Sequence, residues 1–165
     1  MPPTTNYSQH LGDLEPISTC ASNVDRIRAL TNGWTKEQFE RAYAPGKWNA
    51  RQILLHLAQT EMALGNRARM ALATPDYAAQ RFDQDAWVDR ETRITGPEAL
   101  EAFAAISRMN SALFEGLSQA DRETAMSHPE YGSITVDWII HLLAGHQMHH
   151  LAQLQTIAAD LRGSY

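Results

Sequence analysis

The chain of 165 residues has few of the features that mark secreted, membrane-spanning or nucleic-acid-binding proteins. Its one cysteine, Cys20, cannot form an intramolecular disulfide, which favours a reducing cytoplasm. The 14 basic residues are outnumbered by 19 acidic ones, and a net charge of −5 argues against a nucleic-acid or anionic-membrane binder. No signal-peptide pattern is visible, and the apolar runs are too short to span a membrane. We therefore expect a cytoplasmic protein with no membrane or nucleic-acid partner.

The chain also lacks internal repeats, a Gly/Ser-rich linker and clear strand signals. Its length suits one hydrophobic core, because two independent cores would leave too little chain for each. The sequence thus predicts a single domain over residues 1–165, in which residues 1–14 form a loosely ordered N-terminal segment.

Helical periodicity is present along most of the chain. It predicts four long amphipathic helices, at about 17–30, 49–73, 96–117 and 133–161. A capping-box pattern at Thr35 and Gln38 predicts a short helix between the first two. Residues 75–96 are the least regular part, with Phe82 and Trp87 as expected anchors. The predicted fold class is all-α, a four-helix bundle with short connecting helices.

Four of the seven histidines lie on the last predicted helix. His146 and His150 fall in the same stripe as its core-facing apolar residues, one turn apart, whereas His149 lies at the edge of that stripe and His141 points away. Buried imidazoles without partners cost about 1–3 kcal/mol each, so two of them call for an explanation. A His-x-x-x-His pair on a helix is a spacing that holds divalent metals.

A third ligand has to come from a facing helix, and His56 on the second long helix is the candidate. Three neutral histidines would leave a coordination position open for water or substrate, as in catalytic metal sites. The alternative is that these are ordinary core histidines with hydrogen-bond partners.

Four segments, at residues 43–61, 67–75, 128–135 and 145–153, surround these histidines or follow them in a recognisable order. Together they resemble the DinB-like superfamily, and most closely its YfiT-type branch, which is described as metal-dependent hydrolases. It implies a four-helix bundle and a metal triad of His56, His146 and His150. It further implies a divalent metal, with nickel or zinc first and iron or manganese as alternatives, and a homodimer.

The chain departs from the YfiT-type pattern at three positions. It has Gly145 where the pattern has a tryptophan, Gln153 where it has a further histidine, and Phe82 where it has a tyrosine. The triad survives these changes, but substrate recognition is put in doubt.

Two reactions fit such a site, both on a small-molecule substrate. A metal-activated water would make the protein a hydrolase, and a metal-bound thiolate would make it a thiol-dependent transferase. The thiol would be a low-molecular-weight cosubstrate, because Cys20 is expected on a core-facing side of its helix. Two alternatives stay open: a non-catalytic bundle that binds a metal or small ligand, and a plain bundle that acts through partner contacts.

Other residues are weaker candidates. His149 is a candidate acid or base, and Gln153 can orient His150 or a ligand. Trp48, Arg67 and Trp87 are candidates for substrate binding, although packing or solvation explains each of them as well.

Overall fold

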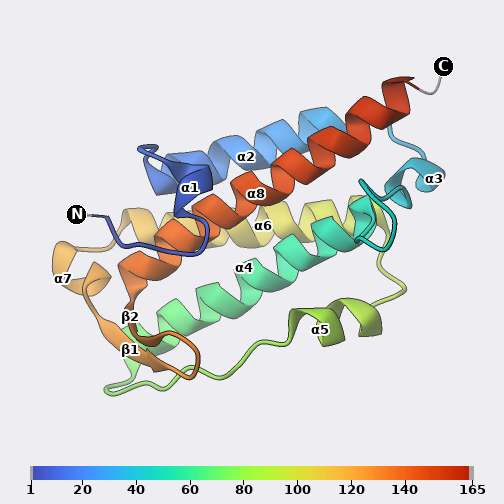
Figure 1. Ribbon diagram of the computed structural model, residues 1–165. Coiled ribbons are helices and arrows are strands. Elements are labelled where there is room, and N and C mark those ends of the chain that lie inside the picture. Colours follow the sequence, from blue (N-terminus) through green and yellow to red (C-terminus); the bar gives the residue numbers. More distant parts are fainter. Residues whose placement is uncertain (1, 164–165) are drawn as a thin grey trace.

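The computed structural model describes residues 2–163 and forms the predicted all-α four-helix bundle (Figure 1). The long helices are α2 (Pro16–Thr31), α4 (Ala50–Ala73), α6 (Gly96–Glu115) and α8 (Val136–Gly163). The short helices are α1 (Ser8–Leu11), α3 (Lys36–Phe39), α5 (Gln84–Arg90) and α7 (Gln119–Arg122). Within the described residues, no helix is long and apolar enough to cross a membrane.

Side chains at the helix starts explain why the chain enters its helices where it does. Thr35 accepts the N–H of Gln38, whose side chain returns to the Thr35 N–H, so the predicted capping box is present. Asn49 and Gln52 form the same motif at the start of α4, and it fixes the helix that carries His56.

The apolar core is divided by a polar layer that crosses all four long helices. One apolar cluster, which includes Leu64 and Leu143, lies toward the start of α8, and a second, which includes Ile53 and Leu154, lies toward its end. The buried polar residues between the two clusters are Asn23, His56, Gln59, Thr60, Glu61, Ser107, Asn110, His146, Gln147 and His150. The histidines singled out in the sequence belong to this layer.

The structure adds a β-hairpin that the sequence did not reveal. Strand β1 (Ala125–His128) pairs antiparallel with β2 (Gly132–Thr135), and β2 leads directly into α8. The backbone of Ser127 also bonds to Tyr77 and Ala79, so the hairpin is tied to the chain that follows α4. In Figure 1 this chain and α5 run alongside α4.

The N-terminal segment differs from the expectation of loose order over residues 1–14. Between Thr5 and Leu11 it lies against the bundle, where α1 contacts α8 and these two residues are buried. The indole N–H of Trp138 donates to the Thr4 carbonyl at 3.0 Å, which ties the segment to the start of α8. Residues far away in the sequence hold the N-terminal segment in place, and the periodicity of the segment itself does not indicate such contacts.

Candidate metal centre

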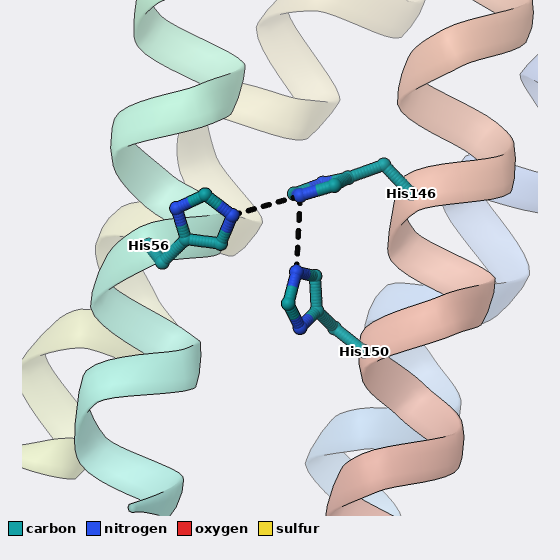
Figure 2. A group of neighbouring side chains, drawn as sticks. All are labelled: His56, His146 and His150. Carbon is teal, nitrogen blue, oxygen red and sulfur yellow. Dashed lines mark hydrogen bonds between the residues drawn. The ribbon is translucent and has the colours of Figure 1, made fainter. Parts of the chain in front are cut away.

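Three histidine side chains from two helices point at one another in the polar layer (Figure 2). His56 comes from α4, and His146 and His150 come from successive turns of α8. The Nε2 atom of His146 lies 2.8 Å from that of His56 and 3.0 Å from that of His150. The three residues are 2–5% exposed, so their convergence takes place in the interior.

The environment keeps these imidazoles neutral. Burial lowers the pKa of His56 from 6.5 to about 3, and repulsion from His150 and His149 adds to the effect. Burial lowers the pKa of His150 to about 4, and it lowers the pKa of His146 well below its ordinary value. Only a neutral imidazole has the lone pair that a metal needs, so at neutral pH the three rings can donate to a cation.

The second ring nitrogen of His150 is held by its own helix. Its Nδ1 lies 2.7 Å from Oε1 of Gln153, so Nδ1 carries the proton and Nε2 keeps its lone pair toward the other two rings. Gln153 is itself held through its Nε2, which lies 3.3 Å from the Tyr43 hydroxyl and 3.1 Å from the Nε2 of His149. By contrast, Nδ1 of His56 is buried without a hydrogen-bond partner among the described residues.

The donor set fits a divalent transition metal. Nitrogen ligands bound to tetrahedral zinc at 2.0–2.1 Å lie about 3.3 Å apart, so the two Nε2 spacings to His146 would widen by about 0.3–0.5 Å. All three donor atoms already lie within 4.8 Å of one another. Imidazole suits zinc, nickel, copper and iron. The His56, His146 and His150 side chains can therefore hold such an ion together.

Two cavities meet at this triad. The first, here called the Trp48 pocket, has a volume of about 310 Å³. The second, the Arg67 pocket, has about 530 Å³. His56 and Tyr7 line both cavities, while His150 lines the first and His146 the second. Each cavity is therefore lined by two of the three triad histidines.

The weaker candidates divide between these cavities. Trp48 lines the Trp48 pocket, with its ring centroid 4.7 Å from that of His56, and His149 and Gln153 line the same pocket. Arg67 lines the second cavity and is buried, in contrast to the solvated helix arginine that was the alternative. Trp87 lines neither cavity and is 36% exposed against Phe82, so the structure does not bring it to the triad.

Sequence reasoning missed Tyr7, which stands over the triad. Its ring centroid is 5.1 Å from that of His146 in an edge-on arrangement and 5.5 Å from that of His149. No pattern in residues 1–14 indicates this contact, because it depends on where the segment lies against α8.

A buried carboxyl in the polar layer was also missed. Glu61 accepts hydrogen bonds from the amide of Gln147 at 2.6 Å and from that of Asn110 at 2.7 Å. Burial raises the pKa of Glu61 to about 7, although both bonds oppose the shift. Its spacing of five residues from His56 turns it away from the face of that histidine and toward Asn110 of α6. Glu61 instead holds the side chain of Gln147, the residue that follows His146 on α8.

Known proteins are similar to this chain in sequence and in fold. A protein from Oceanobacillus iheyensis named "Putative metal-dependent hydrolase OB0782" is 29% identical over 122 residues, which cover 73% of this chain and 71% of the relative. Another from the same organism, OB0413, with the same descriptive name, is 24% identical over 86% of this chain and 82% of its own length.

The structure of YfiT from Bacillus subtilis matches with a TM-score of 0.82 at 21% identity, over 89% of this chain and 86% of that one. Its published description is a probable metal-dependent hydrolase with an unusual four-helix bundle topology. Residues 22–154 match the family described as the DinB superfamily. The resemblance seen in the sequence is confirmed, and the chain belongs to the DinB superfamily.

Proposed function

We propose that this protein is a metal-dependent enzyme that acts on a small molecule, with His56, His146 and His150 as the metal ligands. The observation that carries the proposal is the convergence of three buried, neutral Nε2 donors at the junction of two cavities. A structural role alone would not require cavities on either side of the donors. The relatives' names support the same conclusion.

Nickel and zinc are the metals we propose first, with iron and manganese as alternatives, because three imidazoles favour borderline ions over magnesium or calcium. Such an ion polarises a carbonyl or similar group and lowers the pKa of a bound water or thiol. The residues of the chain do the rest. Gln153 orients His150, while Trp48 and Tyr7 form apolar walls that keep bulk water from the substrate.

Hydrolysis is the reaction we place first, and thiol transfer is the second candidate. Cys20 is buried in the apolar cluster that contains Leu143, and burial raises its pKa well above the ordinary value. It therefore cannot supply the thiolate, so a transferase of this kind would need a low-molecular-weight thiol from solution. We also propose a cytoplasmic homodimer, which light scattering and cell fractionation can test.

The first test is metal content. Protein purified without a histidine tag should hold about one equivalent of a transition metal by mass spectrometry, as isolated or after reconstitution. His150→Ala should lose most of it, whereas the matched variant His141→Ala, on the same helix but outside the triad, should keep it. Less than about a tenth of an equivalent in the wild type after reconstitution would contradict every metal-based function.

The second test separates catalysis from a structural role. Ester and amide libraries, with and without added thiols, should show turnover that the reconstituted metal restores. Loss of turnover in His150→Ala with little change in melting temperature supports an enzyme. A large fall in melting temperature with no turnover in the wild type supports the non-catalytic metal-binding bundle instead.

A further inference from the structure

The Arg67 pocket contains a buried cation with free hydrogen-bond donors. Arg67 is 8% exposed, and its guanidinium donates one bond, to the carbonyl of Gln80. Within residues 2–163, no carboxylate lies within 4.0 Å of it. A guanidinium has five N–H donors, and arginine is rarely buried unless it is paired. The remaining donors are available to an anion in the cavity that Arg67 lines.

Two residues of the β-hairpin bring further donors to the same cavity. The Nδ1 atom of His128 accepts the N–H of Glu130 at 3.2 Å, so the neutral ring carries its proton on Nε2. Burial and the nearby Arg67 lower the pKa of His128, which keeps this ring neutral at pH 7. The Tyr131 hydroxyl accepts a bond from Asn6 at 3.2 Å, which leaves its own proton free to donate. Both side chains line the Arg67 pocket.

Three acidic residues also line the cavity, and all three are exposed. Glu130 pairs with the exposed Arg81 at 3.0 Å. Asp83 accepts the N–H of Ala86 as the N-cap of α5, and Asp85 is exposed. The buried charge is therefore positive. Glu130 is ion-paired with Arg81 and interacts with Arg67 only beyond 4.0 Å, while Asp83 is a cap and Asp85 is solvated. This arrangement favours an anionic group at the inner end near Arg67.

The distance between the Arg67 guanidinium and the triad limits the length of a ligand that can contact both. His56, Thr60, Leu64 and Arg67 all line the cavity from α4. Eleven residues separate His56 from Arg67, or about 16 Å along the helix axis at 1.5 Å per residue. Leu64 lies between His56 and Arg67 on this helix, and Leu142 and Phe82 add further apolar surface to the cavity. A molecule that fills it has an anionic end, an apolar middle and a reacting group at the other end.

We propose that the Arg67 pocket binds the carboxylate end of an elongated small-molecule substrate, through Arg67, His128 and Tyr131. The identity of the reacting end rests on the proposed function, because it assumes a metal at the triad. The carboxylate site does not, since Arg67, His128 and Tyr131 are held by contacts that involve no triad residue.

Two probes that differ at one end test this proposal. Octanohydroxamic acid ends in a methyl group and suberic acid monohydroxamate ends in a carboxylate, while the hydroxamate of each binds transition metals. In calorimetry on the metal-loaded full chain, we expect the carboxylate probe to bind about tenfold more tightly. Sebacic acid monohydroxamate has a longer chain between the same two end groups. Its affinity tests which chain length matches the distance between the triad and Arg67. Arg67→Gln should reduce the advantage to about twofold or less, because it removes the charge.

Arg81→Gln is the matched control. It removes a positive charge that lines the same cavity but is exposed and paired with Glu130, so the advantage should persist. Tyr131→Phe removes only a hydroxyl from a side chain that is 43% exposed and should fold normally. Tyr131→Phe should reduce the affinity advantage of the carboxylate probe about threefold. If Arg67→Gln does not fold, this variant alone tests the carboxylate site.

Metal-free protein separates this proposal from the proposed function. Octanoate should bind metal-free wild type more tightly than octanamide, and Arg67→Gln should abolish that preference. If this holds while hydroxamates gain nothing from added metal, the metal function fails and the carboxylate site stands. An advantage that is absent in the wild type or unchanged in Arg67→Gln overturns the proposal. Tighter binding of 8-aminooctanohydroxamic acid overturns it too, because the exposed carboxylates of the cavity would then dominate.

Discussion

The carbonyl oxygen of Tyr7 lies 2.6 Å from the point that a Cβ atom on Gly145 would occupy. The N-terminal segment therefore rests on the backbone of α8 at a notch that only glycine provides. The residue after this notch is His146, whose ring meets that of Tyr7 edge-on. The YfiT-type pattern has a tryptophan at this position, so the glycine lets the N-terminal segment lie where a large side chain would otherwise stand.

Gly145→Ala should displace the N-terminal segment, because the new methyl group would meet backbone atoms of Tyr7. We expect a loss of about 1–3 kcal/mol in the free energy of unfolding, measured by urea denaturation, and faster proteolysis within residues 2–14. Gly163→Ala on the same helix is the control, since nothing lies within 4 Å of its added Cβ. Equal stability of the two variants would show that the notch is not required.

Gln153→Ala should weaken metal binding by about 10- to 100-fold, because His150 loses the acceptor that orients its ring. Competition with a chromophoric chelator measures the change. Gln153→Glu keeps an acceptor and should retain the affinity. Gln155→Ala, exposed on the same helix, should have no effect, and a similar loss there would refute an orienting role for Gln153.

Metal affinity should change little between pH 6 and pH 8. Protons compete with the metal for imidazole lone pairs, and the lowered pKa values of His56, about 3, and His150, about 4, place that competition at much lower pH. We expect the dissociation constant to stay within about twofold over this range. Urea-unfolded protein, with histidines that titrate near their ordinary pKa, is the control. A tenfold weakening at pH 6 in the folded protein would contradict the neutral triad.

Glu61 should make the protein less stable as the pH rises. Its folded pKa of about 7 lies above the ordinary 4.5, so between these values the unfolded state releases a proton that the folded state keeps. The free energy of unfolding should therefore fall by up to about 3 kcal/mol from pH 4.5 to pH 7. Glu61→Gln should remove this slope, while Glu101→Gln, exposed on α6, should leave it unchanged. The same slope in both variants would assign it to another group.

Helical periodicity was enough to predict the bundle and to make the three histidines candidates, and the resemblance to the DinB-like superfamily then joined them into one triad. The i, i+4 spacing of His146 and His150 fixes their direction on α8, and His56 became a candidate because it lies on the flank of the apolar face of its helix, about 60° from Ile53. The hairpin was missed because Ala125–His128 has no β-branched residue. The buried side chains of Met126 and His128 do alternate with exposed ones, and a turn at Gly132 follows, so a weak signal was present.

The burial of Arg67 could not be predicted in the same way. On α4 alone it looks like a solvated residue, and only the hairpin and the chain around Gln80, brought in by long-range pairing, cover it. Tyr7 is a similar case, since its place depends on Gly145. Contacts between segments far apart in the sequence determine where the Arg67 and Tyr7 side chains lie. The local sequence pattern around each residue gives no indication of these contacts.

The polar layer that divides the core also fixes the position of α8 along its axis relative to α4. If α8 slipped by one turn in either direction, Glu61 would face Leu143 or Leu151 instead of the amide of Gln147. A carboxyl left among leucines costs far more than the apolar contacts could recover, whereas a uniform leucine interior would tolerate the shift. The layer thus selects one register for the bundle. In that register the imidazole of His56 on α4 lies at the same height along the bundle as those of His146 and His150 on α8.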